Sequence, residues 1–287
     1  MINHIICATS LKAIEIVISR LISTCVCVTS ILFSSALLAD GHQAEATTYD
    51  LHYQVQWGDT PLGTATAQWR FDETSYEFKG QMKTEGTLSF FYDFKGENTL
   101  TGEMIDGRYR PSHFTSQSVF DDETYLIDMS WPKGIQTPIY TVEPEKEKGE
   151  THPLRRATLR NVVDPYTAML MGLADLAANG TCDGSYRVFD GRRRSELLLK
   201  DFGTTELVAD QDWSYGGLAH ICGAASKLIG GHKIDSNYDP DEALDYEKVQ
   251  IFIAQPDGKT LMPVRIDMNS FLGAITVRLD MDKSGLR

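Results

Sequence analysis

Histidine, cysteine and serine carry much of enzyme chemistry, and their placement in this chain predicts no familiar reaction. The histidines beyond residue 40 are His42, His52, His113, His152, His220 and His232, and they lack the short spacings of zinc-ligand pairs. The stretch nearest to a Gly-x-Ser-x-Gly nucleophile elbow, Gly86-Thr-Leu-Ser89, has no closing glycine. We therefore predict no catalytic residue, no metal ligand set and no cofactor.

The N-terminus reads as an export signal. Lys12 and Arg20 precede an almost uncharged apolar stretch over 21–38, and small residues that suit cleavage follow at Ala39 and in Ala44-Glu-Ala46. We expect a secretory signal peptide over 1–39, cleaved near residue 39 or 46. The alternative is an uncleaved anchor in the inner membrane, for which 18 residues would be at the short end.

Cysteine usage follows from that signal. Three of the five cysteines belong to the removed segment, which leaves Cys182 and Cys222. An exported chain with two cysteines most simply joins them in a disulfide, and a loop of this length would stabilise the fold by about 4 kcal/mol. Two buried free thiols are the alternative.

An arginine-rich hairpin lies between those cysteines. Asp190-Gly191 is a strong signal for a two-residue type I′ turn between strands at 186–189 and 193–200. We expect Arg192 and Arg194 to share one strand face and Arg193 to take the other. The run Asp190, Gly191, Arg192, Arg193, Arg194 is either an ion-pair cluster that stabilises the hairpin or a site for anionic headgroups.

The charge balance restricts the partners. The formal net charge is −13, and removing the signal, with Lys12, Arg20 and Glu15, makes it one unit more negative. A chain this acidic should be repelled by nucleic acid and by anionic lipid surfaces. We therefore expect no nucleic-acid partner.

The elements that would position these residues are mostly strands. Apolar and polar residues alternate over 50–57, 64–71 and 76–82, with short turns between, which is typical of an antiparallel meander with one apolar face. Further strands are expected over 249–254, 262–269 and 273–280. One all-β domain over 48–282 would accommodate them, although alternation alone does not determine whether the sheet closes.

One segment interrupts the strands with helical spacing. Asp164 can cap a helix, Pro165 suits its first turn, and Gly180 can end it. We predict an amphipathic helix over 165–178 that either fills the sheet as ordinary core or covers a cavity. The candidate apolar ligand face is Trp57, Trp69, Phe71, Met169 and Leu173.

Several pieces of the chain resemble one family of uncharacterised Gram-negative periplasmic proteins, domain of unknown function 3108. They are Tyr49–Trp57 (YDLHYQVQW) with Gly63, Arg110-Pro111, 163–168 (VDPYTA), 188–194 (VFDGRRR) between the cysteines, and 263–266 (PVRI). The resemblance implies a periplasmic protein with a large antiparallel sheet curled into an open barrel or β-spiral, similar to the half-barrels of lipoprotein carriers, with its helix on the concave side. It implies no catalytic residues.

Three functions fit these features. The first is a non-enzymatic envelope protein that binds an apolar ligand, such as a lipid or lipoprotein, or a protein partner. The second is a structural or interaction protein of the envelope with a filled core and no ligand. The third is a hydrolase of unknown type. The first two functions are distinguished by the space under the helix, which would be an open apolar groove in a ligand-binding protein and packed with side chains in a structural one. The oligomeric state does not follow from the sequence.

Overall fold

The computed structural model describes residues 46–86, 89, 93–120, 122–145, 149–234, 244–270 and 273–286. The predicted signal peptide over 1–39 lies outside these residues, as does cleavage at Ala39. In this part of the chain, no helix has both the length and the apolar character needed to span a membrane.

Thirteen strands form one antiparallel sheet. The strands are β1 (Thr47–Trp57), β2 (Thr60–Phe71), β3 (Ser75–Thr84), β4 (Phe94–Ile105), β5 (Arg108–Phe120), β6 (Glu123–Ser130), β7 (Ile139–Glu143), β8 (Gly184–Phe189), β9 (Arg194–Leu207), β10 (Gly217–Gly230), β11 (Val249–Ala254), β12 (Met262–Ser270) and β13 (Gly273–Leu279). Their order across the sheet is β7-β6-β5-β4-β3-β2-β1-β13-β12-β11-β10-β9-β8. The first strand therefore pairs with the last, and β7 and β8 form the two ends.

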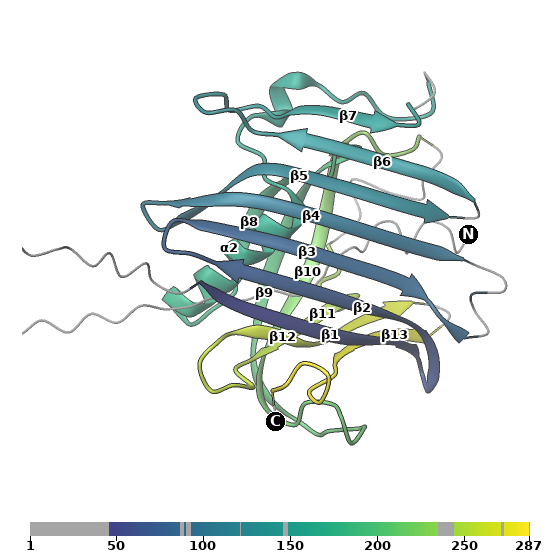
Figure 1. The fold of residues 1–287 in the computed structure, drawn as a ribbon, viewed down its shortest axis with the longest axis vertical. Coiled ribbons are helices and arrows are strands. Elements are labelled where there is room, and N and C mark those ends of the chain that lie inside the picture. Colours follow the sequence, from purple (N-terminus) through teal and green to yellow (C-terminus); the bar gives the residue numbers. More distant parts are fainter. Residues whose placement is uncertain are drawn as a thin grey trace, which may run out of the picture.

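The sheet curls on itself without closing. Figure 1 shows β8, β9 and β10 behind β3 and β4, so that the two halves of the sheet face one another. The end strands approach each other where the rings of Tyr140 and Phe189 meet edge to face at 4.9 Å, but β7 and β8 are not paired in the sheet. The architecture is the predicted all-β open barrel or spiral.

The concave face holds the core because the predicted alternation persists along the strands. Ala65, Ala67, Trp69 and Phe71 are buried on β2, and Tyr76 and Phe78 continue that face on β3. Glycine on the neighbouring strand makes room for these rings: a Cβ on Gly102 would lie 2.1 Å from Tyr76 Cζ. Any larger residue at position 102 would displace a fully buried ring.

The helix α2 (Pro165–Asn179) confirms the predicted helix and is one residue longer. The Asp164 carboxylate accepts hydrogen bonds from the backbone N–H groups of Tyr166 and Thr167, and Gly180, in the left-handed conformation with φ 73°, donates to the Leu176 carbonyl. Both ends of the helix are therefore satisfied by local residues, as the sequence predicted.

α2 lies between the two halves of the sheet. On one side the Tyr166 ring packs on Phe78 of β3, with ring centroids 4.2 Å apart. On the other side Asp175 accepts a hydrogen bond from the Tyr186 hydroxyl of β8 at 2.6 Å. Because α2 contacts both halves, it is part of the core on the concave side (Figure 1).

Candidate functional site

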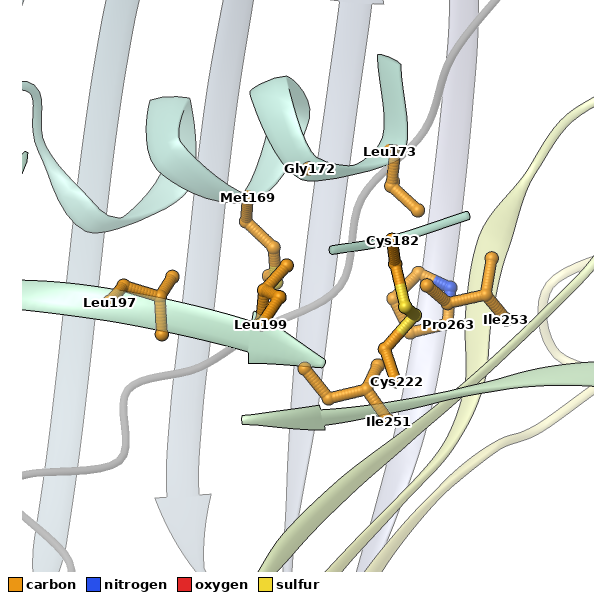
Figure 2. A pocket seen from close by; sticks show the side chains of 10 residues that line it. All are labelled: Met169, Gly172, Leu173, Cys182, Leu197, Leu199, Cys222, Ile251, Ile253 and Pro263. Atoms are coloured by element: carbon orange, nitrogen blue, oxygen red, sulfur yellow. A yellow bond between two sulfur atoms is a disulfide. The ribbon is translucent and has the colours of Figure 1, made fainter. Parts of the chain in front are cut away.

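The space under α2 is the first place where a ligand would be expected, and it is nearly full. A cavity of about 20 Å³ remains between α2 and the strands β9, β11 and β12. Figure 2 shows its lining: Met169, Gly172, Leu173, Cys182, Leu197, Leu199, Cys222, Ile251, Ile253 and Pro263. That volume is close to the minimum for a single water molecule, and an apolar space of this kind normally stays dry.

The five residues of the candidate apolar ligand face do not form one groove. Met169 and Leu173 line the cavity, but Trp69 and Phe71 are buried in the β2 face, with parallel rings 5.8 Å apart, and do not reach it. Trp57 lies apart and is 46% exposed.

The placement of Trp57 has a local cause. It is the last residue of β1 and is followed by Gly58 at φ 54°. The pairing of β1 with β13 stays regular up to Trp57, which lies opposite Ile275, while the neighbouring bulge leaves Leu62 of β2 unpaired. Trp57 therefore keeps the strand face of Leu51 and Tyr53 but lies at its exposed end, outside the core.

Cys182 and Cys222 are joined in a disulfide, with Cα atoms 6.1 Å apart. Both residues are fully buried, and the bond links the segment between α2 and β8 to the middle of β10. It forms one wall of the cavity in Figure 2. The disulfide therefore ties the C-terminal end of α2 to β10, within the half of the sheet formed by β8, β9 and β10.

Asp201 and His220 adjoin this disulfide. A bulge in β9, with Gly203 at φ 77°, aims the Asp201 carboxylate at the imidazole Nε2 of His220. The same carboxylate accepts hydrogen bonds from the backbone N–H groups of Cys182, at 3.0 Å, and Gly203, at 2.7 Å. Burial acts to raise the pKa of Asp201, but the hydrogen bonds from His220 and these N–H groups outweigh it and lower the pKa.

The resulting cluster resembles a metal site in composition. Ligand atoms of Cys182, Asp201 and His220 lie within 4.8 Å of one another. However, the thiolate is the form of cysteine that binds metals, and Cys182 Sγ is bonded to Cys222. As it stands, the cluster holds the disulfide segment against β9 and β10. The position of His220 two residues before Cys222 was the only sequence signal for it.

A second buried polar group lies at the start of α2. The Asp164 carboxylate accepts a hydrogen bond from the Thr167 hydroxyl, which in turn lies 2.9 Å from the hydroxyl of Tyr76 on β3. All three side chains are fully buried. Burial raises the pKa of Asp164 to about 6, against the opposing effect of its hydrogen bonds. Burial also raises the pKa of Tyr76, with a smaller contribution from Asp164.

The arginine hairpin differs from its predicted form. Phe189 pairs with Arg194, and the Asp190 N–H donates to the Arg193 carbonyl at 3.2 Å, so the turn is centred on Gly191 and Arg192, one residue later than predicted. Only Gly191 in it has positive φ, at 87°. The physical reason is the Asp190 carboxylate, which accepts hydrogen bonds from the N–H groups of Arg192 and Arg193. The predicted type I′ turn is wrong, and so is the assignment of Arg192 and Arg193 to strand faces.

The three guanidinium groups of the hairpin have structural partners. Arg193 pairs with Asp190 at 2.9 Å, and Arg192 donates to the carbonyls of Glu143, the last residue of β7, and Pro144. Arg194, only 1% exposed, donates to the Thr158 carbonyl at 3.0 Å and pairs with Glu196. The cluster therefore fastens the β8 end of the sheet to the β7 end, which suits the structural interpretation over the headgroup site.

Together these features define a class: an open, spiral antiparallel sheet whose concave side is filled by a capped helix, with one buried disulfide beside that helix. Within that class, the chain belongs to the family described as Protein of unknown function (DUF3108), whose model matches residues 48–280. This match confirms the resemblance noted from the sequence.

A solved structure is also similar, that of a beta-barrel-like protein of domain of unknown function DUF1849 from Brucella abortus. It is 12% identical, with a TM-score of 0.46, and the alignment covers 81% of this chain and 95% of that chain. No curated protein matches the chain.

Proposed function

We propose that this protein is exported to the periplasm of a Gram-negative bacterium and there, without catalysing a reaction, binds a protein partner through its outer surface. One observation carries the choice of partner over internal ligand: α2 fills the concave side and leaves about 20 Å³. An acyl chain or a lipoprotein anchor needs a cavity of several hundred cubic ångströms, roughly 300 Å³ or more.

Export is supported by the apolar N-terminal stretch and by the buried disulfide. Disulfides persist in oxidising compartments such as the periplasm and are rare in the bacterial cytosol. Cys182 and Cys222 are joined at the centre of the fold, where a reduced pair would leave two thiols in an apolar wall. The intact mass of the purified protein tests both points. Export predicts a chain cleaved near residue 39 or 46, and the disulfide predicts a mass lower by two hydrogens than that of the reduced protein.

The non-enzymatic part of the proposal is supported by the roles of the perturbed carboxyl groups. Asp164 caps α2, and Asp201 holds the disulfide segment. Asp210 pairs with Arg278 at 2.5 Å; burial acts to raise the pKa of Asp210, but Arg278 outweighs it and lowers the pKa. Each of these groups has a structural partner that explains its environment, so none requires a catalytic explanation.

Partner binding is supported by apolar residues that remain outside the core. Ile139 on the end strand β7 is 58% exposed, Leu218 on β10 is 62% exposed and Val208 after β9 is 81% exposed. A photo-crosslinking residue placed at each of these positions in living cells tests the proposal. We expect a protein adduct at one or more of them and none at Lys79, an exposed polar control on β3.

The absence of an adduct at all three positions, together with a lipid bound to the purified protein, would contradict the proposal. The second candidate, an internal apolar ligand, is favoured by the wholly apolar lining under α2 and by the adaptable side chain of Met169. It requires α2 to leave β9 and β11. Titration with a fluorescent fatty acid decides this point: we expect no saturable binding to the wild-type protein.

A further inference from the structure

A second and larger pocket lies at the C-terminal end of β10, away from the cavity under α2. Its volume is about 300 Å³, and it is lined by His152, Pro153, Arg155, Thr158, Ile229 and His232. We propose that this pocket binds a phosphate-type oxyanion carried by a larger molecule. The proposal is independent of the protein partner proposed above.

The two histidines are positioned by backbone hydrogen bonds between segments far apart in the sequence. The His152 N–H donates to the His232 carbonyl at 2.8 Å, and the Gly231 N–H donates to the His152 carbonyl at 2.9 Å. The two imidazole rings stack with centroids 4.2 Å apart. The histidines are therefore held together before any ligand arrives, which lowers the entropic cost of binding.

The arginine hairpin supports this arrangement from behind. A Cβ on Gly231, whose φ is 79°, would lie 2.1 Å from the Arg192 carbonyl oxygen. Only glycine allows the strand end and the hairpin to approach so closely. The backbone of the hairpin thus lies directly behind the strand end that carries His232, while the guanidinium groups have partners elsewhere.

The charge of the lining favours an anion. The titratable or charged side chains that line the pocket are His152, His232 and Arg155, and none of the lining residues is acidic. Arg155 is exposed, and its guanidinium makes no hydrogen bond or ion pair within the described part of the chain. Among the described residues, the pocket lining therefore carries a guanidinium and two imidazoles and no carboxylate, in a chain whose net charge is −13.

The size and the remaining walls indicate what carries the oxyanion. The volume is at the lower end of small-molecule pockets, and the cationic and polar lining suits a phosphate group and the first atoms of its ester better than an acyl chain. Pro153 and Ile229 offer an apolar surface beside the cationic groups. Arginine binds such oxyanions through paired N–H donors, and protonated imidazoles add charge-assisted bonds. The same chemistry fits a soluble phosphate ester or the headgroup of an anionic lipid.

Sulfate is the first probe, because it is a tetrahedral oxyanion like a phosphate group. Titration of the mature protein at fixed pH and ionic strength, followed by the imidazole NMR signals, should show saturable binding. We expect Arg155→Ala to weaken binding roughly fivefold and His152→Gln to weaken it as well. Arg156→Ala is the matched control, since Arg156 is an exposed neighbour that does not line the pocket.

Two further experiments distinguish a soluble phosphate ester from a lipid headgroup. Binding of glycerol phosphate in solution would identify a soluble ester. Sedimentation with phosphatidylglycerol vesicles but not with phosphatidylcholine vesicles would identify a headgroup, and either result supports the proposed pocket if Arg155→Ala weakens the binding. The proposal is overturned if neither sulfate nor glycerol phosphate shows saturable binding and if Arg155→Ala leaves vesicle binding unchanged. Equal losses in Arg155→Ala and Arg156→Ala would also overturn it. Circular dichroism of each variant checks that it folds.

Discussion

The buried carboxyl group of Asp164 should make the stability of this protein fall as the pH rises towards neutrality. The pKa of Asp164 is raised from an ordinary value of 3.8 to about 6 in the folded state. The folded state therefore binds the extra proton more tightly than the unfolded state between these values. The stabilisation that protonated Asp164 gives the folded state is fully present below about pH 4 and is lost as the pH rises through about 6.

The size of the effect follows from that shift. A shift of this size corresponds to about 3 kcal/mol between the two ends of the window. Asp164→Asn removes it, because an amide oxygen can accept the same N–H bonds from Tyr166 and Thr167 without ionising. The free energy of unfolding of the variant, relative to wild type, should therefore increase by about 3 kcal/mol between about pH 4 and about pH 7.5.

Urea denaturation followed by tryptophan fluorescence at a series of pH values measures this difference. Asp201, Asp210 and Asp280 have lowered pKa values, so the stability they contribute is lost below about pH 4 in both proteins and cancels. Asp257→Asn is the control, since that partly exposed carboxylate makes the same kind of backbone bonds in a turn. A difference between Asp164→Asn and wild type that is flat over this range would refute the reasoning.

Three other substitutions test how the core is held. Replacing Cys182 and Cys222 together by serine should lower the free energy of unfolding by about 4 kcal/mol, because the bond closes a loop with a sequence separation of 40; an unchanged urea midpoint would contradict this. Leu173→Ala should cost about 2–5 kcal/mol in the same assay, and a loss below about 1 kcal/mol would mean that α2 is loosely packed. Gly191→Val should cost at least about 1–3 kcal/mol, since it strains a residue at φ 87° and brings Cβ within 2.4 Å of Ile127 Cγ2; a melting temperature equal to that of wild type would exclude the observed turn.

Much of the architecture could be predicted from periodicity alone. The period-two pattern that buries Ala65, Ala67, Trp69 and Phe71 is local, and so are the cap at Asp164 and the stop at Gly180. These signals depend on residues only a few positions apart. They therefore specify strands and a helix without knowledge of the rest of the chain.

The curl of the sheet and the contacts that it creates could not be predicted in this way. His152 and His232 stack only because the β10 end returns to the segment before the short 3₁₀ helix η2 (Arg156–Leu159). Asp201 reaches His220 through a bulge in β9 that no spacing rule indicates. Trp57 shows another limit, since alternation indicates its strand face but not that the end of the strand lies exposed, outside the core. Long-range register and bulges therefore limit what sequence patterns determine about a site.

The space under α2 is nearly full, and we propose that the protein acts through its outer surface. Native mass spectrometry of the protein, released gently from the envelope of its source cell, tests this most directly. We expect the mass of the mature, disulfide-bonded chain, alone or with a protein partner, and no lipid adduct other than one that Arg155→Ala abolishes. A stoichiometric lipid whose removal lowers the melting temperature would contradict it.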